Sequence, residues 1–200
     1  MKYFSLKRYS TNKFIQAYEK LLYDGSLSPN KRQAQIIQHL SLSIQQIEQS
    51  KTRTIFSNIF KYFSKKNSSK KYDGFYLYGP VGSGKSMIMN MFYDAVDIES
   101  KSHLHYNAFM TMIHSKLYQF RMNDGLKSDT SSMMNLVVND LFRKFKLICL
   151  DEFQVVDIAD AMILKGLLEG YLSLGGFLAT TSNKKPTGKH SSICLLCRIV

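Results

Sequence analysis

The chain has 200 residues, of which 44% are hydrophobic, and a formal net charge of +12. This length suits one domain with an extension, and the apolar content is ordinary for a soluble globule. Charged residues such as Lys165 and Glu169 interrupt the longest apolar stretch, and this interruption excludes a membrane span. Residues 1–71 hold 14 Lys/Arg and 3 Asp/Glu, whereas residues 72–200 hold 13 and 12. The core is therefore nearly neutral, which argues against nucleic acid as a partner.

Residues 1–18 have the composition of a mitochondrial targeting segment. Four basic residues and several hydroxyl residues occur there, and the first acid is Glu19. Basic, hydroxyl-rich and acid-poor N-termini are typical of transit peptides. An ordinary basic terminus is the alternative.

Residues 19–71 are predicted to be a helical region followed by a basic connector. Ser28 can cap a helix with Pro29 in its first turn. Apolar residues then recur at helical spacing, at Ile37, Leu40, Ile44 and Ile47. From Lys51 to Lys71 the chain reads as a basic connector, either simply solvated or in contact with phosphates or anionic lipid.

A strand near 75–78 leads into a phosphate-binding loop. The pattern G-x-x-x-x-G-K-[ST] is matched at every specified position by Gly79, Pro80, Val81, Gly82, Ser83, Gly84, Lys85 and Ser86. Glycines let backbone N–H groups face the phosphates, and the helix that follows, to about residue 96, adds its dipole. Lys85 would bind the β- and γ-phosphates of ATP, and the Ser86 hydroxyl would ligate Mg²⁺.

The middle of the chain alternates between strands and helices. We expect a strand near 103–106, a helix from about 108 to 121, a loop from Asn123 to Ser132, and a short helix near 133–142. His103, His105 and His114 lie close in sequence, but as a metal site they are a weak hypothesis. Cys194 and Cys197 form a C-x-x-C without a second ligand pair, which argues against zinc.

A buried strand ending in two acids follows at 147–150. Four apolar residues precede Asp151 and Glu152, as in a strand covered on both faces of a parallel sheet. Asp151 would hold the Mg²⁺ shell and Glu152 would polarise the attacking water. The alternative is a solvated Asp-Glu pair at a strand end. Cys149, within the strand, is interpreted as a small core residue.

The last predicted elements are a helix at about 157–173 and a strand near 177–181. Asp157 caps the helix, and Gly175-Gly176 ends it. The strand runs into Asn183, whose amide can reach both the γ-phosphate and the water, although such a residue also ends strands as plain turn chemistry. The alternation predicts an α/β fold, a P-loop NTPase with a parallel sheet flanked by helices.

Three segments together resemble a known family. They are Gly74 to Gly79, His105 to Met110 and the block from Asp151 to Leu164, and the resemblance covers about residues 14–183. The chain thus resembles the AFG-one-like mitochondrial AAA+ ATPases, a family with bacterial members linked to cell division. The resemblance implies that Lys85, Asp151, Glu152 and Asn183 act in ATP hydrolysis, with Asn183 as the sensor.

The resemblance also implies partners and a location. It implies a homo-oligomeric ring in the mitochondrial matrix or peripheral on the inner membrane. The implied task is protein quality control and turnover of respiratory-chain subunits, with client proteins and inner-membrane proteases as partners.

The chain departs from the family pattern in three places. Asn107 replaces a usual His and Val156 a usual Thr. After Asn183 the family pattern continues with a trans-acting arginine and a helical lid, but residues 184–200 diverge from that pattern. The AAA+ core over 72–183 is therefore predicted to be incomplete. We expect an exposed sheet edge beside the P-loop strand. Residues 193–200 would be either a substitute strand or an unrelated tail.

Two alternatives to an active AAA+ ATPase follow. The first is a truncated ATP-binding remnant with little turnover, and the second is a nucleic-acid-associated AAA+ loader. We expect the 200-residue chain to hydrolyse ATP more slowly than a form with the arginine, unless a residue such as Arg198 supplies that charge.

Overall fold

A computed structural model of the chain describes residues 3–60, 73–123, 130–185 and 198–199. The chain forms two compact units. The helical unit comprises residues 1–71 and 87–99, and the sheet unit comprises residues 72–86 and 100–200. Residues 87–99 thus belong to the helical unit although they follow the P-loop directly in sequence.

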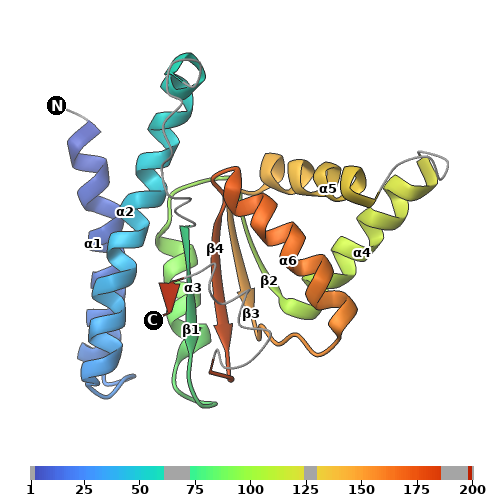
Figure 1. Cartoon of the computed structure of the whole chain (residues 1–200). Helices are drawn as coiled ribbons and strands as arrows, with labels where there is room; N and C mark the ends of the chain where they lie inside the picture. The colour runs from blue at the N-terminus through green and yellow to red at the C-terminus, as the bar shows by residue number, and fades with distance from the viewer. Residues whose placement is uncertain (1–2, 61–72, 124–129, 186–197, 200) are drawn as a thin grey trace. The chain divides into compact units, whose positions relative to one another are not determined.

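Two antiparallel helices, α1 (Tyr3–Tyr23) and α2 (Lys31–Phe60), form most of the helical unit (Figure 1). Gly25 takes a φ of 68° in the turn between them, a conformation that glycine adopts without strain. The apolar positions predicted from helical spacing are buried, namely Ile37, Leu40, Ile44 and Ile47. Phe14 of α1 packs edge-on against Phe92, with ring centroids 6.2 Å apart.

Two details of the predicted N-terminal region were wrong. Ser28 does not cap α2, because Asn30 Oδ1 accepts the N–H of Arg32 at 2.9 Å and that of Gln33 at 3.4 Å. Asparagine caps helices as well as serine does, and it stands directly before the first helical residue. The connector does not begin at Lys51, since α2 continues to Phe60 over a stretch without glycine or proline.

The sheet unit is built on a parallel sheet with the strand order β2-β3-β4-β1-β5. The strands are β1 (Asp73–Tyr78), β2 (Lys101–His105), β3 (Leu147–Asp151), β4 (Phe177–Ser182) and β5 (Arg198–Ile199). β1 lies between β4 and the two-residue β5. β5 therefore covers part of the edge beside β1 that was expected to be open. This agrees with the alternative in which residues 193–200 supply a substitute strand.

Four helices follow the strands, α3 (Lys85–Ala95), α4 (Tyr106–Asn123), α5 (Thr130–Lys144) and α6 (Ile158–Ser173). Several element boundaries differ from the prediction by up to three residues. β2 runs over Lys101–His105 rather than 103–106, and α4 begins at Tyr106 rather than near 108. Tyr106 is the first residue of the helix because its buried ring packs in the main core together with the other buried residues of α4. Residues 130–132 are helical rather than loop, since α5 begins at Thr130.

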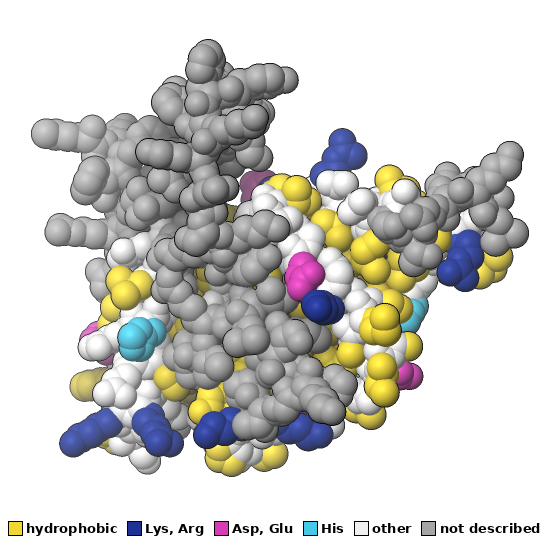
Figure 2. Space-filling model, viewed as in Figure 1, with side chains coloured by type: hydrophobic (Ala, Val, Ile, Leu, Met, Phe, Trp, Pro, Cys, Tyr) yellow, Lys and Arg dark blue, Asp and Glu magenta, His cyan; other side chains and the backbone are white. Residues whose placement is uncertain are grey.

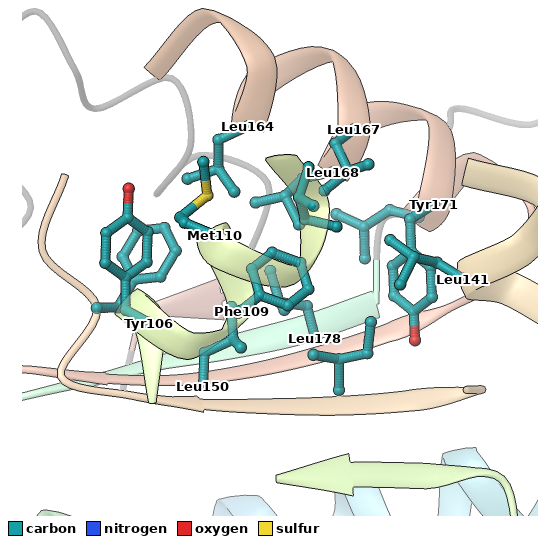
Figure 3. Packing of buried hydrophobic residues seen from close by; sticks show 14 of the residues in the cluster. Tyr106, Phe109, Met110, Leu141, Leu150, Leu164, Leu167, Leu168, Tyr171 and Leu178 are labelled. Carbon is teal, nitrogen blue, oxygen red and sulfur yellow. The ribbon is translucent and has the colours of Figure 1, made fainter. Parts of the chain in front are cut away.

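The main core lies between α4, α5, α6 and one face of the sheet (Figure 3). The fully buried side chains that fill it include Phe109, Ile113, Leu141, Leu150, Leu164, Leu167, Tyr171 and Leu178. Every residue of β3 and β4 is buried, as expected for strands covered on both faces. This packing holds the ends of β3 and β4 in fixed positions, and the candidate site lies at those ends.

Both ends of α6 are formed as predicted. Asp157 has an extended backbone, and its Oδ1 accepts the N–H of Ala159 at 2.7 Å. Gly175 takes a φ of 94° directly after the helix. A Cβ on Gly176 would lie 2.4 Å from the ring of Tyr171, so only glycine fits there without displacing that ring.

Some predictions concern residues outside the described ranges. They are the basic run 65–71, residues 124–129 of the predicted loop, the C-x-x-C at 194–197 and most of the tail. Among the helices of the described ranges, none combines the length and apolarity needed to cross a bilayer. Apolar side chains do reach the surface around α4 and α6 (Figure 2), among them Tyr118, Met122, Ile158 and Met162.

Candidate nucleotide-binding site

The P-loop connects β1 to α3 and has the backbone that phosphate binding requires. Gly82 and Gly84 take φ values of 80° and 86°, which place them in the left-handed region that favours glycine. Val81 lies at the exposed tip of the loop. The loop then enters α3 at Lys85, so that the N–H groups of the first helical turn lie beside it.

Lys85 closes the loop on itself. Its ammonium donates to the carbonyl oxygen of Gly79 at 3.0 Å, to that of Pro80 at 2.8 Å, and to Ser83 Oγ at 3.4 Å. Ser83 Oγ also donates to the Pro80 carbonyl at 2.8 Å. The positive charge is thus held against the concave side of a glycine-rich loop, where an anion would be attracted.

Asp151 is buried at the end of β3, and both of its carboxylate oxygens are hydrogen-bonded. Oδ1 accepts the hydroxyl of Thr181 at 2.7 Å, and Oδ2 lies 2.8 Å from His103 Nε2. Because an ionised carboxylate only accepts, that His103 nitrogen carries the proton in this pair. Two polar neighbours therefore fix the orientation of this carboxylate.

Glu152 is exposed and has an unusual backbone. Its φ of 56° makes it the one non-glycine residue with positive φ in the described ranges. Its N–H donates to Thr181 Oγ1 at 3.2 Å, and the next N–H, of Phe153, donates to the Thr181 carbonyl at 2.7 Å. Non-glycine residues in this conformation are strained and cluster at functional sites.

The end of β4 joins the loop to the acidic segment. The Gly79 N–H donates to the Ser182 carbonyl at 3.2 Å, while the Thr181 hydroxyl donates to Asp151 at the end of β3. Lys184 N–H donates to Ser182 Oγ at 3.2 Å, and Tyr76 donates its hydroxyl to the Lys184 carbonyl at 3.0 Å. The backbone on either side of Asn183 is thus anchored, and the Asn183 side chain is exposed.

All predicted site residues therefore lie on segments that meet at the carboxyl ends of β1, β3 and β4. Sequence reasoning missed two contributors, Thr181 and His103. Thr181 lies at the polar end of the predicted strand near 177–181, and a polar side chain at the end of a strand next to an acidic one is a signal for it. His103 was grouped with two other histidines, but it pairs with Asp151, whereas His114 lies 2.8 Å from Asp160 on α6.

The donors at this edge suit magnesium. Mg²⁺ prefers oxygen ligands and is commonly held by one or two protein groups together with phosphate. The Ser86 hydroxyl is exposed at the start of α3, and Asp151 keeps a lone pair on each oxygen beyond the bonds to Thr181 and His103. No cluster of three or more His, Cys, Asp or Glu side chains suited to a metal occurs within the described ranges.

Cys149 is not part of this chemistry. Its side chain is fully buried, and burial, with the nearby Asp151 charge, raises the pKa of the thiol. A thiol that stays protonated is a poor nucleophile. This confirms the interpretation of Cys149 as a core residue.

Comparison with known proteins identifies the family. The family model for AFG1-like ATPase matches residues 13–191, which is most of the chain. The chain belongs to the AFG1-like ATPase family. The family resemblance predicted from the three sequence segments is thus confirmed.

Two curated proteins illustrate this relationship. Lactation elevated protein 1 homolog B of Danio rerio is 40% identical over 119 residues, which cover 56% of this chain and 23% of that protein. Cell division protein ZapE of Escherichia coli K12 is 31% identical over 177 residues, which cover 84% of this chain and 45% of that protein. The chain spans less than half the length of either relative.

Among solved structures, domain III of the Thermotoga maritima replication initiation protein DnaA aligns with a TM-score of 0.48 at 14% identity. That alignment covers 66% of this chain and 55% of the DnaA chain.

Proposed function

We propose that the chain binds ATP with Mg²⁺ at the P-loop and hydrolyses it. The observation that carries this proposal is the hydrogen-bonded junction at the end of β4. Ser182 bonds the start of the P-loop, and Thr181 bonds both the carboxylate and the backbone of the acidic segment. Loop, acids and the Asn183 segment therefore belong to one rigid edge of the sheet, where α/β folds bind ligands.

Each site residue then has a chemical role. Lys85 exchanges its bonds to the loop carbonyls for the β- and γ-phosphates, and the P-loop N–H groups bind the remaining phosphate oxygens. Ser86 and Asp151 would hold a magnesium ion, which would neutralise charge on the phosphates. Glu152, exposed directly after β3, takes a proton from the attacking water, and the Asn183 amide orients that water.

The proposed cellular role is that of a mitochondrial ATPase acting on proteins, at or near the inner membrane. The basic, acid-poor first eighteen residues support a mitochondrial location. The near-neutral charge of residues 72–200 favours protein clients over nucleic acid. Assembly into a homo-oligomeric ring and cooperation with inner-membrane proteases belong to the same proposal, which rests on family membership.

Lys85→Ala tests the nucleotide site. The variant should bind ATP about tenfold or more weakly, because a charge-assisted contact to phosphate is lost, worth roughly 1.5–3 kcal/mol. Titration calorimetry of the 200-residue chain measures this. Lys165→Ala, which removes an exposed lysine from α6, is the matched control and should bind ATP like the wild type. Equal ATP affinity in Lys85→Ala and wild type would refute the proposed site.

A further inference from the structure

One buried threonine contacts three consecutive residues of the acidic segment. Thr181 is 1% exposed and lies on β4 next to β3. Its hydroxyl donates to Asp151 Oδ1 at 2.7 Å and accepts the Glu152 N–H at 3.2 Å. Its carbonyl accepts the Phe153 N–H at 2.7 Å. The single proton and one lone pair of the hydroxyl are thus committed to the two acids.

This contact replaces strand pairing at the point where the strands separate. The register of β3 on β4 ends at Leu150 opposite Thr180, one residue before Asp151. Beyond that point the backbone turns, and Glu152 enters the left-handed region. The acceptor of the Glu152 N–H is consequently a side-chain hydroxyl rather than a backbone carbonyl of the neighbouring strand.

The neighbouring threonine shows what an ordinary buried hydroxyl does in this strand. Thr180 is equally buried, and its hydroxyl donates to the Phe75 carbonyl at 3.4 Å, within the sheet. Its hydrogen bond satisfies a donor in the core. Thr181, by contrast, directs its hydroxyl to the two carboxylate-bearing residues assigned to magnesium and water.

We propose that Thr181 is a positioning residue for ATP hydrolysis. Its hydroxyl sets the orientation of the Asp151 carboxylate toward magnesium and holds the Glu152 backbone in the left-handed conformation that directs its side chain. This inference rests on the proposed ATP- and magnesium-binding function. Groups that orient a metal ligand commonly change metal affinity or activity by about 10–100-fold when they are removed.

The test compares variants that separate the hydroxyl from the shape of the side chain. Thr181→Val keeps the shape and loses the hydroxyl, whereas Thr181→Ser keeps the hydroxyl and loses the methyl group. Thr180→Val removes a buried hydroxyl one residue away and is the matched control. Binding of a fluorescent ATP analogue to the 200-residue chain is measured in Mg²⁺ and in EDTA, and melting temperatures are recorded for all variants.

We expect Thr181→Val to bind the analogue in EDTA within about twofold of wild type and to lose about tenfold or more of the enhancement by Mg²⁺. Thr181→Ser and Thr180→Val should keep the enhancement.

Hydrogen exchange of the Glu152 amide is a second measurement, and it needs no metal. The Glu152 amide should exchange with deuterium at least about threefold faster in Thr181→Val, since its acceptor is gone, and at the wild-type rate in Thr181→Ser.

Four results would overturn the inference. The first is full Mg²⁺ enhancement together with a protected Glu152 amide in Thr181→Val. The second is a Thr181→Ser variant as impaired as Thr181→Val, which would assign the effect to the methyl group. The third is failure of Thr181→Val to fold while Thr180→Val folds, which would make Thr181 a residue of the core alone. If wild type shows no Mg²⁺ enhancement, the role of Thr181 falls together with the magnesium site. The Lys85→Ala variant separates these results from failure of the proposed function. If the proposed ATP site is wrong, Lys85→Ala binds ATP as well as wild type; if only the role of Thr181 is wrong, Lys85→Ala still binds ATP more weakly.

Discussion

Glu152, the residue proposed to act on the attacking water, has a locally strained backbone. A side chain at a φ of 56° brings its Cβ close to the following carbonyl oxygen, which costs about 1–2 kcal/mol. The hydrogen bonds from Glu152 and Phe153 to Thr181 offset this cost and hold the turn. The strain that remains at Glu152 lowers the stability of the fold at a residue proposed to take part in catalysis.

Replacing Glu152 with glycine should release this strain. We expect Glu152→Gly to leave the free energy of unfolding unchanged or raise it by up to about 1 kcal/mol, although glycine usually destabilises. Gln154→Gly is the control, since Gln154 is exposed, lies two residues on and has no positive φ, and it should lose roughly 0.5–1 kcal/mol. Urea denaturation measures both. Equal destabilisation of the two variants would contradict the assignment of strain to Glu152.

At the scale of elements, α6 carries much of the core and depends on how it begins. Asp157 supplies its N-cap, and Leu164, Leu167 and Leu168 of the helix are buried against the sheet unit's core. Only four residues, 153–156, separate Glu152 from this cap, so a helix that frays at its start would loosen the acidic segment as well.

Loss of the cap should be measurable as stability. Asp157→Ala leaves the Ala159 N–H without its side-chain acceptor and should lower the free energy of unfolding by about 1 kcal/mol. Asp157→Ser, which keeps a capping oxygen, should stay within a few tenths, on the order of 0.3 kcal/mol, of wild type. Chemical denaturation followed by circular dichroism measures the difference. Equal losses in the two variants would point to the charge of Asp157 rather than to its capping bond.

At the scale of the whole molecule, the segment proposed to target the chain to mitochondria also contributes to the folded helical unit. The segment predicted to direct import overlaps α1, and two of its residues, Phe14 and Tyr18, are buried in the helical unit. Loss of a buried aromatic ring costs about 3–5 kcal/mol. Processing after import should therefore cut before Phe14, so that the folded helical unit is retained.

Import can be followed with the chain fused at its C-terminus to a fluorescent protein. We expect a mitochondrial signal and, by mass spectrometry, a new N-terminus before Phe14, because the basic residues Lys2, Lys7 and Arg8 drive import. Changing these three residues to Gln is the control and should leave the protein in the cytosol. A diffuse signal from the unaltered chain, or a mature terminus beyond Tyr18, would contradict this prediction.

What the sequence by itself determined about this protein is the part of the site encoded by short segments. The P-loop, the strand that ends in Asp151 and Glu152, and the cap and glycine end of α6 are local patterns, because each depends on residues a few positions apart. The family resemblance likewise came from short segments, namely Gly74 to Gly79, His105 to Met110 and Asp151 to Leu164. The tertiary structure alone decided which residues support the acids, since Thr181 is 30 residues and His103 is 48 residues from Asp151 along the chain. Such contacts depend on strand order and register, and these are set by the packing of the whole sheet rather than by any local pattern.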